Sequence, residues 1–228
     1  MTTALITGAN KGIGLETARR LLGLGWTVWL GSRDPERGRE ALAQLDGDVR
    51  LLDIDITDDA SVTAAAAAVA PTGLDVLVNN AAIASQQAGE VPDAAELGGV
   101  LAVNLLGTTR VLHAFVPLLH GSHDPRVVQV SSTLGSFALA SDPATPAELF
   151  HYPTYAVSKA ALNMLTVQLA RTVDGIRFVA VEPGYTATDL NGHSGTQTPA
   201  EAAANVVAAA TADLATGSFV GADGAIAW

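Results

Sequence analysis

Short apolar runs alternate along the chain with longer stretches whose apolar residues recur at helical spacing. Several short runs, among them DVLV, VVQV and FVAV, are apolar at consecutive positions, which indicates strands buried on both faces of a parallel sheet. The runs predict strands at 3–7, 27–32, 49–55, 74–79, 126–132, 176–182 and 218–220. The stretches between them predict helices at 13–24, 35–45, 59–70, 94–119, 154–172 and 200–214.

This alternation predicts an α/β fold: a single doubly wound, Rossmann-type domain over residues 1–228, with a parallel sheet of about seven strands flanked by helices. No linker or shift in composition divides the sequence. Ligands of such sheets bind at the carboxyl ends of the strands. Three irregular stretches, 84–92, 134–153 and 183–199, follow predicted strands and are therefore expected at that edge.

Composition narrows the classes of function. With 228 residues, 49% of them hydrophobic, the chain can bury a large core. The formal charge of −11 argues against a nucleic acid or an anionic membrane as partner. The absence of cysteine excludes disulfides and thiolate metal sites, and the histidines show no metal-binding spacing. The apolar runs are short, and the first residues lack a signal-peptide pattern, so we expect a cytoplasmic protein without a membrane segment.

A glycine-rich turn connects the first predicted strand to the first predicted helix. It reads Thr-Gly-Ala-Asn-Lys-Gly-Ile-Gly from Thr7 to Gly14. Glycines let a pyrophosphate approach the backbone, and the helix N-terminus offers free N–H groups and a favourable dipole. The turn therefore predicts a dinucleotide site, formed by Gly8, Asn10, Lys11, Gly12, Ile13 and Gly14.

Tyr155 and Lys159 are four residues apart in a predicted helix, so both side chains lie on one face. A phenol with an ordinary pKa of about 10 carries protons poorly near neutrality. A nearby ammonium favours phenolate, so we expect Lys159 to lower the pKa of Tyr155. Tyr152 is a competing candidate, but the fourth residue after it is Ala156.

These motifs together resemble the short-chain dehydrogenase/reductase family, in its Tyr-dependent branch. The resemblance rests on Thr-Gly-x3-Gly-x-Gly in place of the commoner Gly-x-Gly-x2-Gly, on the Tyr-x3-Lys segment, and on the Ser-Ser-Thr-Leu-Gly segment that precedes it. It covers essentially the whole chain. Asn10–Gly14, the Arg33-Asp34 turn and the segment from Pro183 to Asp189 look most like NADPH-dependent carbonyl reductases of the family.

The resemblance implies a role for each matching residue. Ser132, three residues before Gly135, would bind the substrate oxygen, and Asn104 would hold a water linked to Lys159. Ser131 is assigned to turn chemistry. Lys159 would also bind the nicotinamide ribose. The implied catalytic residues are Asn104, Ser132, Tyr155 and Lys159, and Ser132, Leu134 and Tyr185 would face substrate. Further cofactor contacts would come from Asp55, Ile56, Asn80, Ala81, Tyr155, Lys159, Pro183, Gly184, Thr186 and Thr188.

The sequence departs from the family pattern at Ala82, where the family has glycine. This puts in doubt a positive φ angle at that position.

The cofactor prediction is NADP(H). The second predicted strand ends at Ser32, where NAD-binding folds usually place an acid for the ribose 2′-hydroxyl. Arg33 follows Ser32, and two cations, Arg33 and Lys11, would favour a 2′-phosphate. Asp34 leaves NAD open, because a slip of one residue would place an acid near the ribose.

The predicted function is hydride transfer from NADPH to a ketone or aldehyde, with Tyr155 as general acid. An NAD-dependent alcohol dehydrogenase of the same family and a non-catalytic dinucleotide sensor remain alternatives. A sugar-nucleotide epimerase would have different loop spacing. The partner is a small carbonyl or alcohol, and monomer or homo-oligomer stays undecided. The stretch between Ser132 and Tyr155 is partly apolar and is expected to cap the pocket through Phe137, Pro143, Pro146, Leu149 and Phe150.

Overall fold

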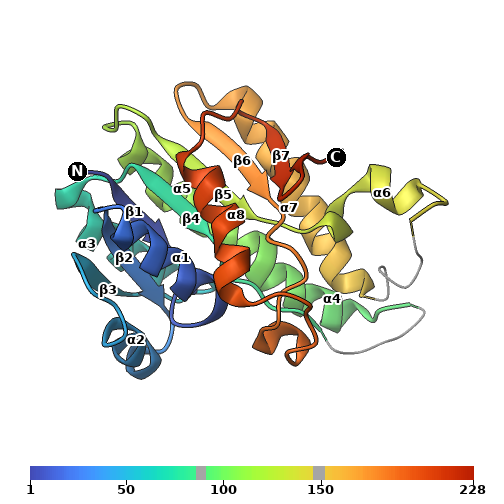
Figure 1. Cartoon of the computed structure of the whole chain (residues 1–228), viewed down its shortest axis with the longest axis horizontal. Helices are drawn as coiled ribbons and strands as arrows, with labels where there is room; N and C mark the ends of the chain where they lie inside the picture. The colour runs from blue at the N-terminus through green and yellow to red at the C-terminus, as the bar shows by residue number, and fades with distance from the viewer. Residues whose placement is uncertain (86–90, 146–151) are drawn as a thin grey trace.

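Eight strands form one sheet in the order β3-β2-β1-β4-β5-β6-β7-β8 (Figure 1). The computed structural model describes residues 1–85, 91–145 and 152–228. Strands β1 to β7 pair in parallel, and β8 is antiparallel to β7. The strands are β1 (Thr3–Ile6), β2 (Thr27–Ser32), β3 (Val49–Asp53), β4 (Val76–Asn79), β5 (Arg126–Val130), β6 (Arg177–Val181), β7 (Ser218–Gly221) and β8 (Gly224–Ala225). The doubly wound α/β fold is confirmed. The prediction missed β8, because two residues are too short for a periodicity to show.

Helices cover both faces of the sheet (Figure 1). Side chains of α1, α2 and α8 pack in the apolar cluster on one face, and those of α3, α5 and α7 in the cluster on the other. The helices are α1 (Gly12–Gly23), α2 (Pro35–Leu42), α3 (Asp59–Val69), α4 (Ala94–Leu101), α5 (Thr108–Leu119), α6 (Phe137–Ser141), α7 (Pro153–Thr172) and α8 (Pro199–Thr211).

Consecutive apolar residues in the strands supply both clusters. In β4, Val76 and Val78 point into the cluster with α1 and α8, whereas Leu77 points into the cluster with α5. Because successive side chains of a strand point to opposite faces, a strand covered on both sides must be apolar at every position. This is the physical reason that the VLV, VVQV and FVAV runs predicted the strands.

The predicted helix at 94–119 is continuous in space but is not regular. A π-helical segment, Ala102–Gly107, separates α4 from α5. The stretch Ala94–Leu119 is also long and apolar enough to span a membrane by length and composition, with a mean hydropathy of 1.4. That observation is weak, because a core helix meets the same test. Val111, Leu112 and Phe115 of α5 are buried against the sheet, as a core helix requires.

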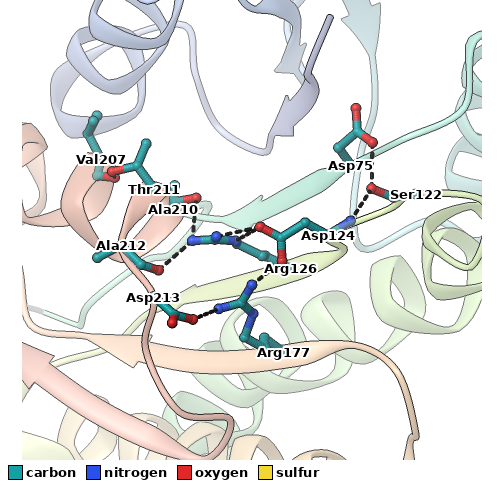
Figure 2. A network of polar contacts seen from close by, with 10 residues as sticks. All are labelled: Asp75, Ser122, Asp124, Arg126, Arg177, Val207, Ala210, Thr211, Ala212 and Asp213. Carbon is teal, nitrogen blue, oxygen red and sulfur yellow. Dashed lines mark hydrogen bonds and ion pairs between the residues drawn. The ribbon is translucent and has the colours of Figure 1, made fainter.

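At the amino ends of β5 and β6, arginines join the sheet to α8 (Figure 2). Arg126 donates to the carbonyl oxygens of Ala210, at 3.1 Å, and Ala212, at 2.5 Å, at the end of α8. Its guanidinium also pairs with Asp124, which in turn pairs with Arg177. These hydrogen bonds, led by that from Arg126, keep the pKa of Asp124 low. A cation at a helix C-terminus satisfies carbonyls that the helix leaves unpaired.

Candidate active site

The glycine-rich turn lies directly against the segment that follows β4. Asn80 donates through Nδ2 to the carbonyl oxygens of Thr7, at 3.0 Å, and Gly8, at 3.1 Å. The Thr7 hydroxyl accepts from the backbone N–H groups of Asn80 and Ala81, both at 3.1 Å. Gly8 has φ +64°, and a Cβ there would lie 2.9 Å from the Ala81 Cα. Asn80 and Ala81, predicted as cofactor contacts, therefore also hold this turn in place.

The N-terminus of α1 fits a phosphate. Lys11 is its N-cap, and no described side chain caps the helix, so its first N–H groups are open to a ligand. Gly12 has φ +57°. A Cβ on Gly14 would lie 2.7 Å from the Gly8 carbonyl oxygen, which leaves no room for a side chain. The turn predicted from the sequence therefore has the geometry of a pyrophosphate site.

Lys11 pairs with a carboxylate of the segment that follows β6. Its ammonium lies 2.5 Å from Asp189 Oδ2, and His193 Nε2 lies 2.9 Å from the other oxygen of the same carboxylate. The Lys11 and Asp189 side chains are both about half exposed, so solvent screens this pair and it contributes little to stability. The side chain can exchange Asp189 for a 2′-phosphate at little cost.

The end of β2 carries the three residues on which the cofactor prediction depends, Ser32, Arg33 and Asp34. Ser32 is buried and donates to the carbonyl oxygen of Asp34 at 2.7 Å. The Asp34 carboxylate caps α2 by accepting from Glu36 N at 2.9 Å. Asp34 is therefore a helix cap, which explains its position without a ribose contact. Arg33 is exposed, and no described carboxylate lies within ion-pair distance of it.

Asp55 and Ile56 follow β3, as the adenine prediction requires. Asp55 Oδ1 accepts from the N–H and hydroxyl of Thr57 at 2.9 and 2.7 Å. Partial burial opposes ionisation, but the bonds from Thr57 and the charge of Arg33 lower the pKa of Asp55 overall. The Ile56 side chain is buried in the core, where a Cβ on Gly107 would lie 2.9 Å from it.

Two catalytic candidates on α7, Tyr155 and Lys159, lie close together beside the end of β5, which Ser132 follows. Tyr155 lies in the first turn of α7. Lys159 Nζ lies 5.3 Å from the Tyr155 ring centroid and donates to the Val130 carbonyl oxygen at 2.7 Å. Val130 ends β5, two residues before Ser132. The Ser132 hydroxyl accepts from Leu134 N at 3.2 Å, which leaves its proton free for a substrate oxygen.

The pKa of Tyr155 moves opposite to the predicted direction. Burial, aided by the negative charge of Glu182, raises it above 10.0. Burial also lowers the pKa of Lys159 to about 8, although Glu182 opposes this shift. Lys159 is only 2% exposed, so its ammonium is itself destabilised and cannot outweigh the desolvation of the phenol. Without cofactor, Tyr155 is thus held in its protonated form.

Asn163 is a site residue that the sequence reasoning missed. Its Oδ1 accepts from the Ser131 hydroxyl at 2.5 Å, and its Nδ2 donates to the Gly135 carbonyl oxygen at 3.1 Å. Asn163 is four residues after Lys159, on the same face of α7, and that spacing could have identified it. The Ser131 hydroxyl therefore bonds a distant helix residue, instead of making the local turn contact that was predicted for it.

Asn104 lies in the π-helical segment and is 1% exposed. Its amide exchanges two hydrogen bonds with the Ile83 backbone, both 2.8 Å, and donates to Ser158 Oγ at 3.0 Å. The amide therefore fastens the segment after β4 to α7. The partners of the Asn104 side chain in the structure are protein groups. The water that was predicted between Asn104 and Lys159 stays a prediction. π-Helical segments often occur at functional sites because they redirect backbone groups.

The turn after β6 is built around Pro183 and Gly184. Gly184 has φ +95°, and Gln197 Nε2 occupies the space beside it while donating to the Pro183 carbonyl oxygen at 2.5 Å. Thr186 is buried and donates to the Gly184 carbonyl oxygen at 2.9 Å. The methyl group of Thr188 lies 3.6 Å from a Cβ built on Gly12, so this segment faces the phosphate turn. Gln197 was not predicted, because nothing in its local sequence marks it.

The predicted substrate side is partly described. Tyr185 is 52% exposed, and its hydroxyl lies 2.6 Å from Ser194 Oγ. Leu134 belongs to the 3-10 turn Thr133–Gly135 beside Ser132, and Phe137 is exposed at the start of α6, a helix the sequence did not predict. Pro146, Leu149 and Phe150 lie outside the described residues.

Backbone angles bear on the departure at Ala82. Among the described residues other than glycine, only His193 has positive φ, so Ala82 lacks the positive φ angle that its departure from glycine had put in doubt. No group of three metal-ligating side chains occurs among the described residues.

Comparison with known proteins agrees with this geometry. The sequence matches the short chain dehydrogenase family over residues 2–199, and the chain belongs to that family of oxidoreductases. It is 33% identical over 220 residues to the short-chain dehydrogenase anuI of Penicillium roqueforti, covering 91% of this chain and 87% of the relative. It is 31% identical over 279 aligned positions to (-)-isopiperitenone reductase of Mentha piperita, covering 88% and 89%.

A solved structure extends the likeness to the whole chain. The NADPH-bound carbonyl reductase from chicken fatty liver superposes with a TM-score of 0.89 at 29% identity, covering 100% of this chain and 99% of that one. Family and fold together define an enzyme that uses a nicotinamide dinucleotide on small molecules.

Proposed function

We propose that this protein is an NADPH-dependent carbonyl reductase in which Tyr155 donates the proton. The observation that carries the proposal is the position of Lys159. Its ammonium lies beside the Tyr155 ring and is hydrogen-bonded to the last residue of β5, two residues before Ser132. These two contacts place the proton donor and the cation beside the end of β5, close in sequence to the hydroxyl that would bind the substrate oxygen.

The residues present fit NADP(H). The open N-terminus of α1 and the left-handed glycines Gly8 and Gly12 would hold the pyrophosphate. Arg33 and Lys11 would bind the 2′-phosphate, while Asp34 is occupied as a helix cap. When bound, NADPH supplies the hydride that reduces the carbonyl carbon. The relatives named as reductases support the same direction of reaction.

The side chains of this chain divide the remaining work. Ser132 donates a hydrogen bond to the carbonyl oxygen and stabilises its developing negative charge. Tyr155 delivers a proton to the same oxygen as general acid. Its raised pKa keeps the phenol protonated before reaction, which suits reduction better than alcohol oxidation. Lys159 would bind the ribose hydroxyls and, as the proton leaves Tyr155, stabilise the phenolate.

A substrate screen with both reduced cofactors tests this proposal. The purified protein is given ketones, aldehydes and quinones, and consumption of NADPH or NADH is followed by absorbance. We expect turnover of at least one apolar carbonyl, with kcat/KM at least about tenfold higher for NADPH, since bidentate charge-assisted contacts to a phosphate are worth well over 1 kcal/mol. Equal or faster turnover with NADH would show that Arg33 and Lys11 do not select the cofactor.

A further inference from the structure

Glu182 joins two segments of the site that are far apart in sequence. It follows β6, and its two carboxylate oxygens accept hydrogen bonds from two different turns. Oε2 accepts from the backbone N–H of Thr133, the residue immediately after Ser132. Oε1 accepts from the backbone N–H of Gly184 at 2.8 Å. One side chain thus connects the turn that carries the catalytic serine with the turn that would border the nicotinamide.

The same carboxylate lies within electrostatic reach of both catalytic groups on α7. The titratable groups on which its charge acts are Tyr155 and Lys159. The other neighbours that it bonds are neutral backbone groups: the N–H of Thr133, the N–H of Gly184 and, through its own N–H, the carbonyl oxygen of Val220 in β7 at 2.8 Å. A carboxylate that accepts two N–H bonds is held in one orientation, so its charge has a fixed place in the site.

We propose that Glu182 is a positioning residue for carbonyl reduction, which holds the Ser132 turn against the Pro183-Gly184 turn and keeps a fixed negative charge in the site. This inference rests on the function proposed above. A negative charge near a phenol opposes phenolate, and near an ammonium it favours the charged form. Glu182 therefore keeps Tyr155 ready to donate and Lys159 charged up to a higher pH than burial alone would allow.

Removal of the Glu182 charge has an expected direction. In Glu182→Gln the charge is lost while the shape is kept. Both the pKa of Tyr155 and the pKa of Lys159 then fall, because the group that raised each of them is gone. Reduction needs a protonated phenol and a charged lysine, so both changes move the alkaline limb of the pH profile to lower pH.

Lysine side-chain NMR tests the charge without relying on activity. The chain has two lysines, Lys11 and Lys159, so selective labelling of lysine Cε gives two signals. We expect Glu182→Gln to lower the titration midpoint of Lys159 by about half a pH unit or more while leaving Lys11 unchanged. Glu40→Gln removes the same charge from the exposed face of α2 and serves as the matched control. An unchanged Lys159 midpoint in Glu182→Gln would overturn the inference.

Steady-state pH profiles with NADPH test the positioning role. In Glu182→Gln we expect the alkaline limb of kcat to move to lower pH, with kcat near neutrality several-fold lower. Glu182→Asp keeps the charge but is one methylene too short to bridge both turns. It should lower kcat several-fold with less change in the Lys159 midpoint, and it supplies a second variant if Glu182→Gln does not fold.

The outcomes separate the two proposals. A Glu182→Asp variant with the kcat of the unmodified protein would show that bridging is not needed, and a loss of stability with unchanged rates and pH profile would leave Glu182 a merely structural role. An unchanged kcat in Glu182→Asp contradicts the inference, and so does a variant of Glu182 that loses only stability. If the unmodified protein reduces no carbonyl while the Lys159 midpoint still shifts in Glu182→Gln, the proposed function fails and the electrostatic role of Glu182 stands.

Discussion

At the scale of single residues, the site contains positions where one added carbon atom would displace neighbouring backbone. Gly135 is the clearest case. A Cβ at Gly135 would lie 2.5 Å from the carbonyl carbon of Lys159 and 2.7 Å from Ala160 N. The turn after Ser132 can therefore approach the backbone of α7 this closely only through glycine, and this approach fixes the position of the turn relative to α7.

Gly135→Ala should damage both stability and catalysis. Overpacking against helix backbone typically costs about 1–3 kcal/mol, and a shift of about 1 Å in α7 lowers kcat/KM by on the order of a hundredfold. Urea unfolding and steady-state kinetics check the two effects. Gly98→Ala on α4 is the control, because nothing lies within 4 Å of a Cβ there and alanine favours a helix. Normal kinetics in Gly135→Ala would refute the contact.

The sequence predicted residues whose chemistry is local and missed those whose role depends on distant contacts. The glycine turn and the Tyr155–Lys159 pair were predicted from local spacing, and Ser132 was predicted from the family resemblance of its segment. Glu182 and Gln197 were not, since each acts by bonding backbone groups of a segment remote in sequence. The direction of the Tyr155 pKa shift also failed, because burial of Lys159 cannot be read from a four-residue spacing.

At the scale of elements, the carboxyl edge of the sheet has a functional role and the amino edge a structural one. The carboxyl edge carries the polar side chains of the site, whereas the amino edge holds α8 in place through Arg126 and Arg177 (Figure 2). The strands were predictable from consecutive apolar residues. The π-helical segment at Asn104 and the short α6 were not, because a change in hydrogen-bond register or a single helical turn leaves no periodicity.

Arg126→Met tests this separation of tasks. The Arg126 side chain is 11% exposed, and its removal leaves the last carbonyls of α8 without their donor. We expect the free energy of unfolding to fall by about 1–3 kcal/mol, since a partly buried carbonyl, that of Ala210, loses a charged partner. The kcat of the folded enzyme should stay within about twofold, because the change is at the edge opposite the site. A large fall in kcat with little loss of stability would contradict this division.

At the scale of the whole molecule, the burial of Lys159 in the site lowers the stability of the folded protein. Burial lowers the pKa of this lysine from 10.5 to about 8. Between those two pH values the unfolded chain binds the proton more tightly than the folded chain does, so stability rises with pH across that window. Below it, the full penalty of the buried charge applies, on the order of 3 kcal/mol.

Lys159→Met should therefore make the cofactor-free protein more stable at neutral pH. Loss of the hydrogen bond to Val130 offsets about 1 kcal/mol of the gain, which leaves about 2 kcal/mol at pH values below 8. The gain should shrink as the pH rises through the window toward 10.5. Urea unfolding at pH 7 and again near pH 9.5 measures it. If Lys159→Met is less stable than the unmodified protein at both pH values, burial of the ammonium does not destabilise the folded protein.

The central claim is that Tyr155 donates the proton in NADPH-linked carbonyl reduction. The most direct measurement is the turnover of Tyr155→Phe on the best carbonyl of the screen, together with NADPH binding followed by fluorescence. Phenylalanine keeps the ring beside Lys159 and removes only the hydroxyl. The account predicts NADPH affinity within a few-fold of the unmodified protein and kcat lower by at least about a thousandfold, as the loss of a general acid requires. Substantial turnover in this variant would contradict it.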